Sequence, residues 1–170
     1  MKNIIILFLI FSAVVFAKWD VGTAYTEDGK TATTFTTSET KTESSLIISV
    51  VLEGSDGYSS VNIKNKDIKR GDNLRLDIRD RAGNLVTYNI FGSDIGNGEV
   101  LIIDRQTDRS DRLVRMLMSG ISAKLYNNDE LSATFNLDKL KKFMRKNVGF
   151  SDWYKYKLKN REKKWFNILK

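Results

Sequence analysis

The alternation of apolar and polar positions along this chain predicts a series of short β-strands. Residues 45–53 are rich in β-branched side chains and are followed by turn-forming residues. In residues 73–80 apolar and charged side chains alternate, which is the period-two pattern of a half-buried strand. Similar patterns, separated by turns that include 81–84 and 127–129, predict further strands at 19–25, 31–37, 58–64, 85–91, 99–104, 121–126 and 131–136.

The pattern changes to a helical period in two segments, one ending at Gly120 and one running from Asp138 to near Gly149. Ser110 or Asp111 is suited to cap the start of the first helix. The apolar positions that share a helical face in these segments are Leu113, Met116, Leu117, Leu140, Phe143 and Met144. Many short strands with few helices predict a mainly β (α+β) fold, namely a β-sandwich or barrel-like domain with one or two short helices and a basic C-terminal helix.

The first residues have the pattern of a secretory signal peptide. Lys2 provides a cationic start, residues 4–16 form an apolar run, and Ala17 is the small residue at the expected cleavage site. A membrane-spanning helix needs about 20 apolar residues, which is longer than this run, so cleavage is favoured over retention as an N-terminal anchor. We expect removal of residues 1–17 and export of the mature protein to the periplasm or the extracellular space.

The absence of cysteine and histidine narrows the chemistry of this chain. An exported domain without cysteine has no disulfides, so its hydrophobic core must stabilise it. Ser-His-Asp and Cys-His catalytic systems and conventional zinc sites are excluded, and no phosphate-binding glycine motif is present. We therefore predict no catalytic residues, no metal and no cofactor, although carboxylate chemistry, a lysine-activated hydroxyl and an oxygen-ligated cation remain open.

The best candidates for carboxylate chemistry are three aspartates near the start of the first helix, Asp104, Asp108 and Asp111. Such a group is suited to bind a cation or to act in acid–base catalysis. Helix capping is the more ordinary role for these carboxylates. The basic residues that interleave with them and neutralise their charge are Arg105, Arg109 and Arg112. The glycine-rich segment 94–99 also offers oxygen ligands, but it lacks the ligand pattern of an EF-hand loop and is expected to be a connection.

Positive charge is concentrated at the C-terminal end. The chain carries 28 Lys and Arg against 21 Asp and Glu, a net charge of +7, and loss of Lys2 with the signal peptide leaves +6. Residues 139–170 hold twelve basic residues against Asp152 and Glu162, a local +10, so residues 18–138 sum to −4. We therefore divide the mature chain into a β-rich domain, 18–148, and a basic amphipathic tail, 149–170.

The tail is expected to be a basic helix, because Tyr154, Leu158 and Trp165 fall at helical spacing among the lysines. Such a helix is suited to lie on an anionic membrane surface or to pair with an acidic protein, and export argues against nucleic acid. The candidate contact residues are Trp153, Tyr154, Lys155, Lys157, Leu158, Lys159, Arg161, Lys163, Lys164, Trp165 and Phe166. In the alternative interpretation, Trp153, Trp165 and Phe166 pack on the sandwich and the lysines are only solvated.

The order of features along the chain also carries a family resemblance. Trp19 and a threonine-rich strand precede the strand 45–53; the strand 100–104, a short helix, the segment ISAKLYNND and the segment 133–144 then follow. This order resembles small exported bacterial proteins of the invasion-associated locus B type and related secretion-associated β-sandwich proteins. The resemblance implies an accessory or interaction protein at the cell envelope, with no catalytic residues to transfer.

Three functional hypotheses follow from these observations. The leading one is a non-enzymatic exported envelope accessory or binding protein, in which the β domain is a scaffold and the cationic tail contacts an envelope or protein partner. The second is a membrane-active protein or toxin that acts on anionic lipid through the tail. The third and least favoured is a carboxylate-dependent hydrolase, which requires two carboxylates that converge in a pocket.

Overall fold

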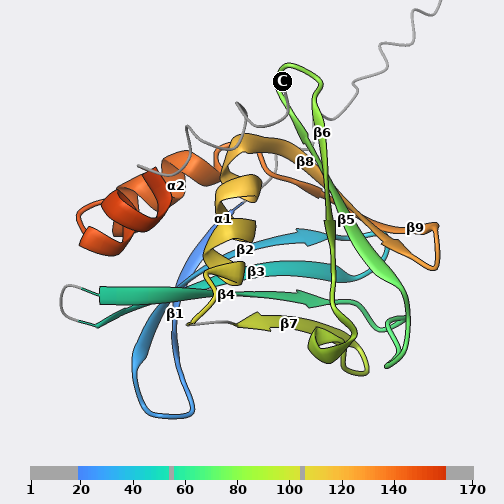
Figure 1. Ribbon diagram of the computed structural model, residues 1–170, viewed down its shortest axis with the longest axis horizontal. Coiled ribbons are helices and arrows are strands. Elements are labelled where there is room, and N and C mark those ends of the chain that lie inside the picture. The colour runs from blue at the N-terminus through green and yellow to red at the C-terminus, as the bar shows by residue number, and fades with distance from the viewer. Residues whose placement is uncertain (1–18, 54–55, 104–105, 160–170) are drawn as a thin grey trace, which may run out of the picture.

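A computed structural model describes residues 19–53, 56–103 and 106–159, and the expected signal peptide, 1–17, lies outside these ranges. Within them the chain forms two antiparallel sheets, with strand orders β1-β2-β3-β4-β7 and β6-β5-β8-β9 (Figure 1). The strands are β1 (Asp20–Tyr25), β2 (Thr31–Glu39), β3 (Ser44–Glu53), β4 (Asp56–Lys64), β5 (Leu74–Asp80), β6 (Leu85–Asn89), β7 (Glu99–Ile103), β8 (Gly120–Asn127) and β9 (Glu130–Asn136). The helices are the 3-10 turn η1 (Gly92–Asp94), α1 (Arg109–Ser119), α2 (Leu140–Val148) and the π-helix η2 (Trp153–Lys159). This arrangement confirms the predicted mainly β, sandwich-like fold.

The period-two pattern of the sequence sets which face of each strand is buried. In β3 the side chains of Leu46, Ile48 and Val50 are buried, while the residues between them are partly exposed. In β5 the apolar residues are buried and alternate with Arg75 and Asp77, as predicted. A slip of one residue would turn these apolar side chains to solvent, so burial fixes the register.

The hairpin turn between β8 and β9 follows from local chemistry. Asn128 and Asp129 both have positive φ, 49° and 67°, which is the backbone that a tight two-residue hairpin requires. Asparagine and aspartate tolerate this conformation better than other residues with a side chain. The predicted turn at 127–129 is therefore confirmed.

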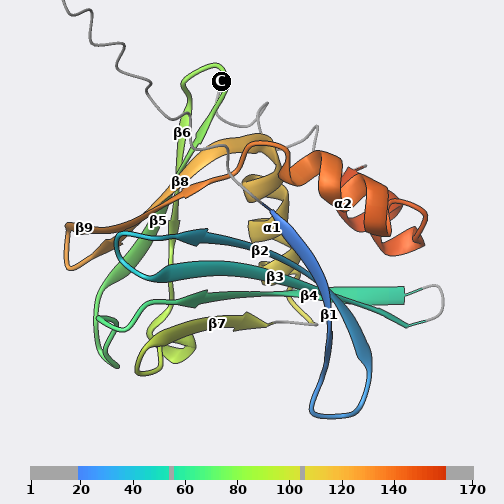
Figure 2. The same ribbon diagram turned by 180° about the vertical axis from the view of Figure 1, so that it is seen from behind.

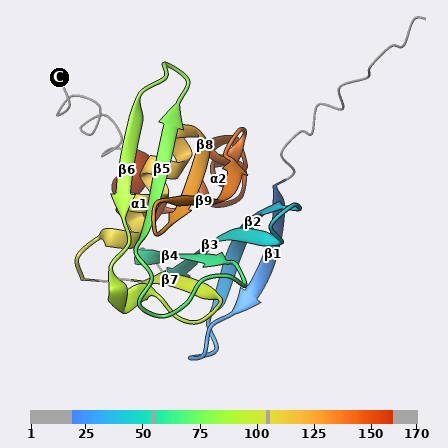
Figure 3. The ribbon, with the colours of Figure 1, turned by 90° about the vertical axis from the view of Figure 1, so that its right-hand side faces the viewer.

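Helix α1 lies between the two sheets. It packs against β4 and β7 of one sheet and against β5 and β8 of the other, and the sheets meet directly where β9 contacts β2 and β3. Figure 3 shows the two sheets from the side, with both α-helices behind the second sheet in this view. A large hydrophobic core joins both sheets, α1, α2 and η2. The apolar face of α1 thus packs between the two sheets on the side where they do not contact each other directly.

Two predicted helix starts are corrected by the structure. The residue at the N-cap position of α1 is Asp108, in the left-handed conformation with φ 63°, and not Ser110 or Asp111, and its side chain makes no capping hydrogen bond. Both of these residues are buried in the first turn, because the helix starts earlier and that turn faces β4. Helix α2 begins at Leu140 after Lys139, one position later than Asp138 would give, and it ends at Gly149 as predicted.

Candidate binding surface

The C-terminal segment 150–159 docks on the sandwich through one side of η2. Trp153, Tyr154 and Leu158 are 1%, 5% and 1% exposed, and they belong to the same hydrophobic core as the two sheets. In a π-helix, hydrogen bonds join residues five apart, so Trp153 and Leu158 lie on the same side. Tyr154 and Leu158, which the sequence predicts on one helical face, are both buried, and the π-helical turn, in place of the expected α-helical one, brings Trp153 onto the core as well.

A glycine in β4 makes room for the docked tryptophan. A Cβ atom at Gly57 would lie 3.1 Å from Cβ of Trp153 and 2.8 Å from the carbonyl oxygen of Val51. No side chain fits at position 57 without displacing the indole or the neighbouring strand. The absence of a side chain at Gly57 thus leaves the space in which Trp153 packs.

Next to Trp153, a buried carboxylate connects α1, β4 and η2. Oδ1 of Asp111 accepts hydrogen bonds from Oγ of Ser59 at 2.6 Å, from the backbone N–H of Ser59 at 3.2 Å and from Nε1 of Trp153 at 3.2 Å. Burial raises the pKa of the Asp111 carboxyl above its usual value, and the Ser59 hydrogen bond acts in the opposite direction. The side chain is 4% exposed, so this carboxylate positions the tryptophan and does not face solvent.

Two basic side chains hold the far end of η2. Arg115, which is 3% exposed, donates to the carbonyl oxygen of Lys157 at 2.6 Å and to Oδ2 of Asp108 at 2.8 Å. Nζ of Lys157 donates to the carbonyl oxygen of Gly57 at 3.0 Å. The bond between Arg115 and Lys157 joins α1 to η2, and the bond between Lys157 and Gly57 joins η2 to β4. The docked segment is therefore fixed by polar contacts as well as by its apolar side.

Other basic residues of this region remain at the surface. Lys155 and Lys159 are exposed on the outer side of η2, and Lys155 pairs only loosely with Asp152, at 3.6 Å. The exposed basic side chains of α2 are Lys141, Lys142, Arg145 and Lys146. We call these six residues the basic C-terminal surface. They are carried by two helices whose other sides are buried. Figures 1 and 2 show α2, from the two opposite directions, at the edge of the molecule next to α1.

The candidate contact residues therefore separate into groups. Trp153, Tyr154 and Leu158 are buried and, while docked, are not available to a partner. Lys157 is half-buried and bonded to the scaffold. Lys155 and Lys159 face solvent. The remaining candidates lie outside the described residues: Arg161, Lys163, Lys164, Trp165 and Phe166.

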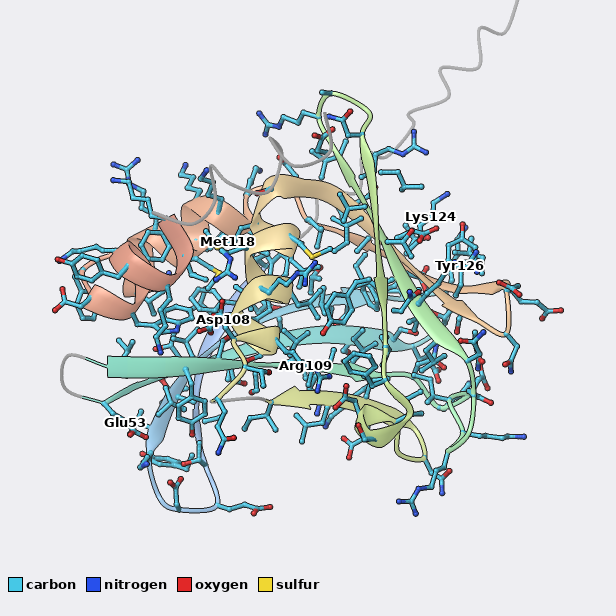
Figure 4. All side chains as sticks on the ribbon, viewed as in Figure 1. Glu53, Asp108, Arg109, Met118, Lys124 and Tyr126 are labelled. Atoms are coloured by element: carbon cyan, nitrogen blue, oxygen red, sulfur yellow. The ribbon has the colours of Figure 1, made fainter. Side chains whose placement is uncertain are left out.

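The three aspartates near α1 do not form one site in the part of the chain that the structure describes. Asp104 lies outside it, Asp108 pairs with Arg115, and Asp111 is buried under Trp153. Asp108 and Arg109, both labelled in Figure 4, are neighbours in sequence but have different partners, since Arg109 pairs with Asp94. Over the described ranges no three acidic side chains gather as they would around a metal ion. Of the arginines expected to neutralise these aspartates, Arg109 pairs with Asp94 instead and Arg105 lies outside the described residues, while Arg115, which the sequence analysis did not single out, pairs with Asp108.

Comparison with models of protein families, with curated proteins and with solved structures finds no match for this chain. None of the helices between residues 19 and 159 that the structure describes is long and apolar enough to cross a membrane. The docked segment and the basic residues around it are the candidate functional site of this chain.

Proposed function

We propose that this protein is a non-enzymatic exported accessory protein that binds an acidic protein partner at the cell envelope through its basic C-terminal surface. The observation that carries the proposal is the docking of η2. Three apolar side chains of this segment are buried, whereas Lys155 and Lys159 on its other side are exposed. The segment thus combines a fixed position with outward positive charge.

Rigid presentation of charge favours binding. A free basic tail loses conformational freedom when it contacts a partner, and that loss opposes association. Lysines on a docked helix have already lost the backbone part of this freedom. Clustered positive charge also attracts an acidic partner and speeds encounter at low salt.

The proposed location rests on the N-terminal sequence, which has the pattern of a cleavable signal peptide. The resemblance to exported proteins of the invasion-associated locus B type points in the same direction. The cysteine-free composition suits a domain that keeps its fold outside the cell by packing alone.

The membrane-active alternative has fewer apolar contacts than the sequence suggested. Trp153 and Leu158, which would enter the boundary of a bilayer, are in the core. The aromatic side chains that do face solvent here are Phe150 and Tyr156, 71% and 64% exposed. Among the residues that the structure describes, a membrane-bound form would use these two aromatic side chains together with the lysines.

The test is retention of an envelope protein by the immobilised mature protein, residues 18–170. One variant reverses charge on the docked segment, Lys155→Glu with Lys159→Glu. A matched control, Lys69→Glu with Arg70→Glu, reverses the same number of charges in the exposed loop between β4 and β5. We expect a retained acidic protein that is lost with the first variant and with rising salt, and kept with the control.

Two results would contradict this proposal. In the first, the docked-segment variant and the control retain the same proteins in the same amounts. In the second, the mature protein retains no acidic protein but sediments with vesicles of anionic lipid, and substitution of Phe150 and Tyr156 by alanine abolishes that binding. The second result would establish the membrane-active alternative instead.

A further inference from the structure

The strand β1 forms an open edge of the five-stranded sheet. It pairs with β2 on one side, and in Figure 3 no helix or strand that the structure describes lies beyond it on the other. Once the signal peptide is removed as expected, Lys18 alone precedes Trp19, which is too little chain to cover a six-residue strand. The backbone N–H and C=O groups along such an edge are available to pair with another strand.

The other edges of the two sheets differ from this one. Ile95 forms an antiparallel bridge to Val100 of β7 on the side away from β4, and β9 packs against β2 and β3. Edges are usually protected by charged residues, prolines or bulges. Residues 21–25 of β1 include no charged residue and no proline, and the pairing of β1 with β2 is regular throughout. The edge strand β6 is open as well and provides a control below.

The hairpin fixes which backbone groups of β1 point outward. The N–H of Thr26 donates to the carbonyl oxygen of Lys30 at 2.8 Å, so these two residues form a hydrogen-bonded pair. Hydrogen-bonded and non-hydrogen-bonded pairs alternate along antiparallel strands. The residues whose backbone groups point away from β2 are therefore Val21, Thr23 and Tyr25.

The same three residues carry exposed side chains. Val21 is 38% and Tyr25 is 79% exposed, although both lie on the face of the sheet that carries the buried Phe35, and Thr23 between them is exposed too. Val21 and Tyr25 are equally far from Thr23 along the strand. The outward edge is therefore arranged symmetrically about Thr23.

A second copy of this chain fits such an edge. In an antiparallel pairing with the two-fold axis at Thr23, the outward donors and acceptors of the two strands face each other in both directions. The same register places Val21 opposite Tyr25 of the second copy. A β-branched side chain opposite an aromatic one is a favourable cross-strand pair, and each dimer contains this pair twice.

Charge agrees with this register. Asp20 lies opposite Thr26 of the second copy, and Lys30 is the next residue across the same row. Opposite charges therefore approach each other at both ends of the pairing. The two copies of Asp20 are about 20 Å apart along the strands, since each residue advances the strand by about 3.3 Å, so their mutual repulsion is screened by salt.

We propose that two copies of this chain pair through β1 into a symmetric dimer, in which their five-stranded sheets form one continuous sheet. This interface does not involve Lys155 or Lys159, so it goes beyond the proposed function and either proposal can fail alone. A six-residue strand from each copy buries less than the roughly 1,200 Å² of a standard interface. We therefore expect a reversible dimer with a dissociation constant of about 10–100 μM.

The test is sedimentation equilibrium of the mature protein, residues 18–170, between about 1 μM and about 500 μM, a range that spans the expected dissociation constant. We expect the average mass to rise from that of a monomer to that of a dimer. Thr23→Pro removes the N–H at the two-fold axis but no hydrogen bond to β2, because this N–H points outward. It is expected to weaken dimerisation at least tenfold.

The matched control is Thr87→Pro in the middle of β6. The N–H of Ile90 donates to the carbonyl oxygen of Leu74, so by the same alternation the N–H of Thr87 points away from β5. This variant makes the same change at the open edge of the other sheet and is expected to leave dimerisation unchanged. Lys155→Glu with Lys159→Glu is also expected to leave it unchanged.

Two further variants test the register. One carries Val21→Lys with Tyr25→Lys, and the other carries Val21→Glu with Tyr25→Glu. Each places like charges opposite each other in its own dimer, so each alone is expected to be monomeric. An equimolar mixture places lysine opposite glutamate and is expected to form a heterodimer. Circular dichroism establishes that every variant is folded.

Four results would overturn the proposal. A monomeric mass at the highest concentration would show that the edge does not pair with itself. Equal weakening by Thr23→Pro and Thr87→Pro would show that the dimer does not depend on β1. A mixture of the lysine and glutamate variants that stays monomeric would exclude the register. Retention of an envelope protein by the monomer, lost with Thr23→Pro, would assign the edge to another chain.

Discussion

Helix η2 packs on α1 and β4, and the β1–β2 hairpin forms one edge of the five-stranded sheet, but the two regions are held in opposite ways. Trp153 and Leu158 of η2 are each 1% exposed and meet a buried carboxylate. In the hairpin β1 is mostly exposed, and Tyr25 is 79% exposed. The hairpin turn carries ion pairs of Lys30 with Asp28 and Glu53, all at the surface.

The comparison between buried contacts in η2 and surface ion pairs in the hairpin indicates which contacts stabilise the fold most. Surface ion pairs compete with water and salt and contribute little, whereas burial of a large aromatic side chain contributes several kcal/mol. We expect substitutions in the two regions to differ greatly in effect, and the predictions below test this difference.

The largest effect is expected from Trp153→Ala. Loss of the indole leaves a cavity above Gly57 and removes a donor from Asp111, so the free energy of unfolding should fall by about 3–5 kcal/mol. Urea denaturation measures this change. Tyr156→Ala, at an exposed position of the same helix, is the control and should change stability by less than about 0.5 kcal/mol. Equal effects of the two substitutions would contradict the docking of η2.

The next largest effect is expected from Arg115→Met. The methionine keeps an apolar stem but leaves Asp108 and the carbonyl of Lys157 without their donor, which should cost about 3 kcal/mol in the free energy of unfolding. Adding Asp108→Asn removes the charge that Arg115 neutralises and should restore part of the loss. A double variant no more stable than Arg115→Met alone would show that the ion pair is not the reason.

A smaller and pH-dependent effect is expected from Asp111→Asn, which retains an acceptor oxygen but cannot ionise. Because the folded pKa of Asp111 is raised, the folded wild type takes up this proton at a higher pH than the unfolded chain does. Wild-type stability relative to the variant should therefore rise as pH falls through this raised pKa, and should level off below the unfolded pKa. Denaturation of both proteins between pH 7 and pH 3 measures the difference, and a constant difference would contradict burial of an ionisable Asp111.

The smallest effect on stability is expected in the hairpin. The pKa of Asp28 is lowered to about 2, first by the hydroxyl of Thr26 and then by Lys30. Thr26→Val should raise this pKa toward its usual value, and Lys30→Ala should raise it less. NMR titration of the carboxyl carbon measures both shifts. Because a lowered folded pKa stabilises the folded state above the unfolded pKa, both substitutions should lower the midpoint of thermal unfolding slightly at neutral pH and less as the pH falls toward 2, and a change as large as that of Trp153→Ala would show that the hairpin matters more than its exposure indicates.

Local features of the fold could be predicted from the residues. The strand at 45–53, the alternating strand at 73–80 and the turn at 127–129 depend on neighbours in sequence, and the structure has all three. Both α-helices were located from their apolar spacing. Their first residues were misplaced because Asp108 and Lys139 adopt the left-handed conformation, which composition does not reveal.

The docking site could not be predicted in the same way. Asp111 lies 52 residues from Ser59 and 42 from Trp153, so no local pattern connects the three. The aspartate looked like a helix cap or a surface ligand, and Gly57 looked like part of a turn. Only the pairing of the strands brings β4 under η2.

The sequence by itself determined the period of each strand, the main turns, the composition without cysteine and the concentration of positive charge after residue 138. These properties depend on single residues or on close neighbours. Tertiary structure alone decided which side of 150–159 is buried. The π-helical turn places Trp153 and Leu158 on the same side, and the space left by Gly57 lets Trp153 pack in the core. Burial is a property of the assembled sandwich, and it separates the lysines that stay exposed from the residues that fix them in place.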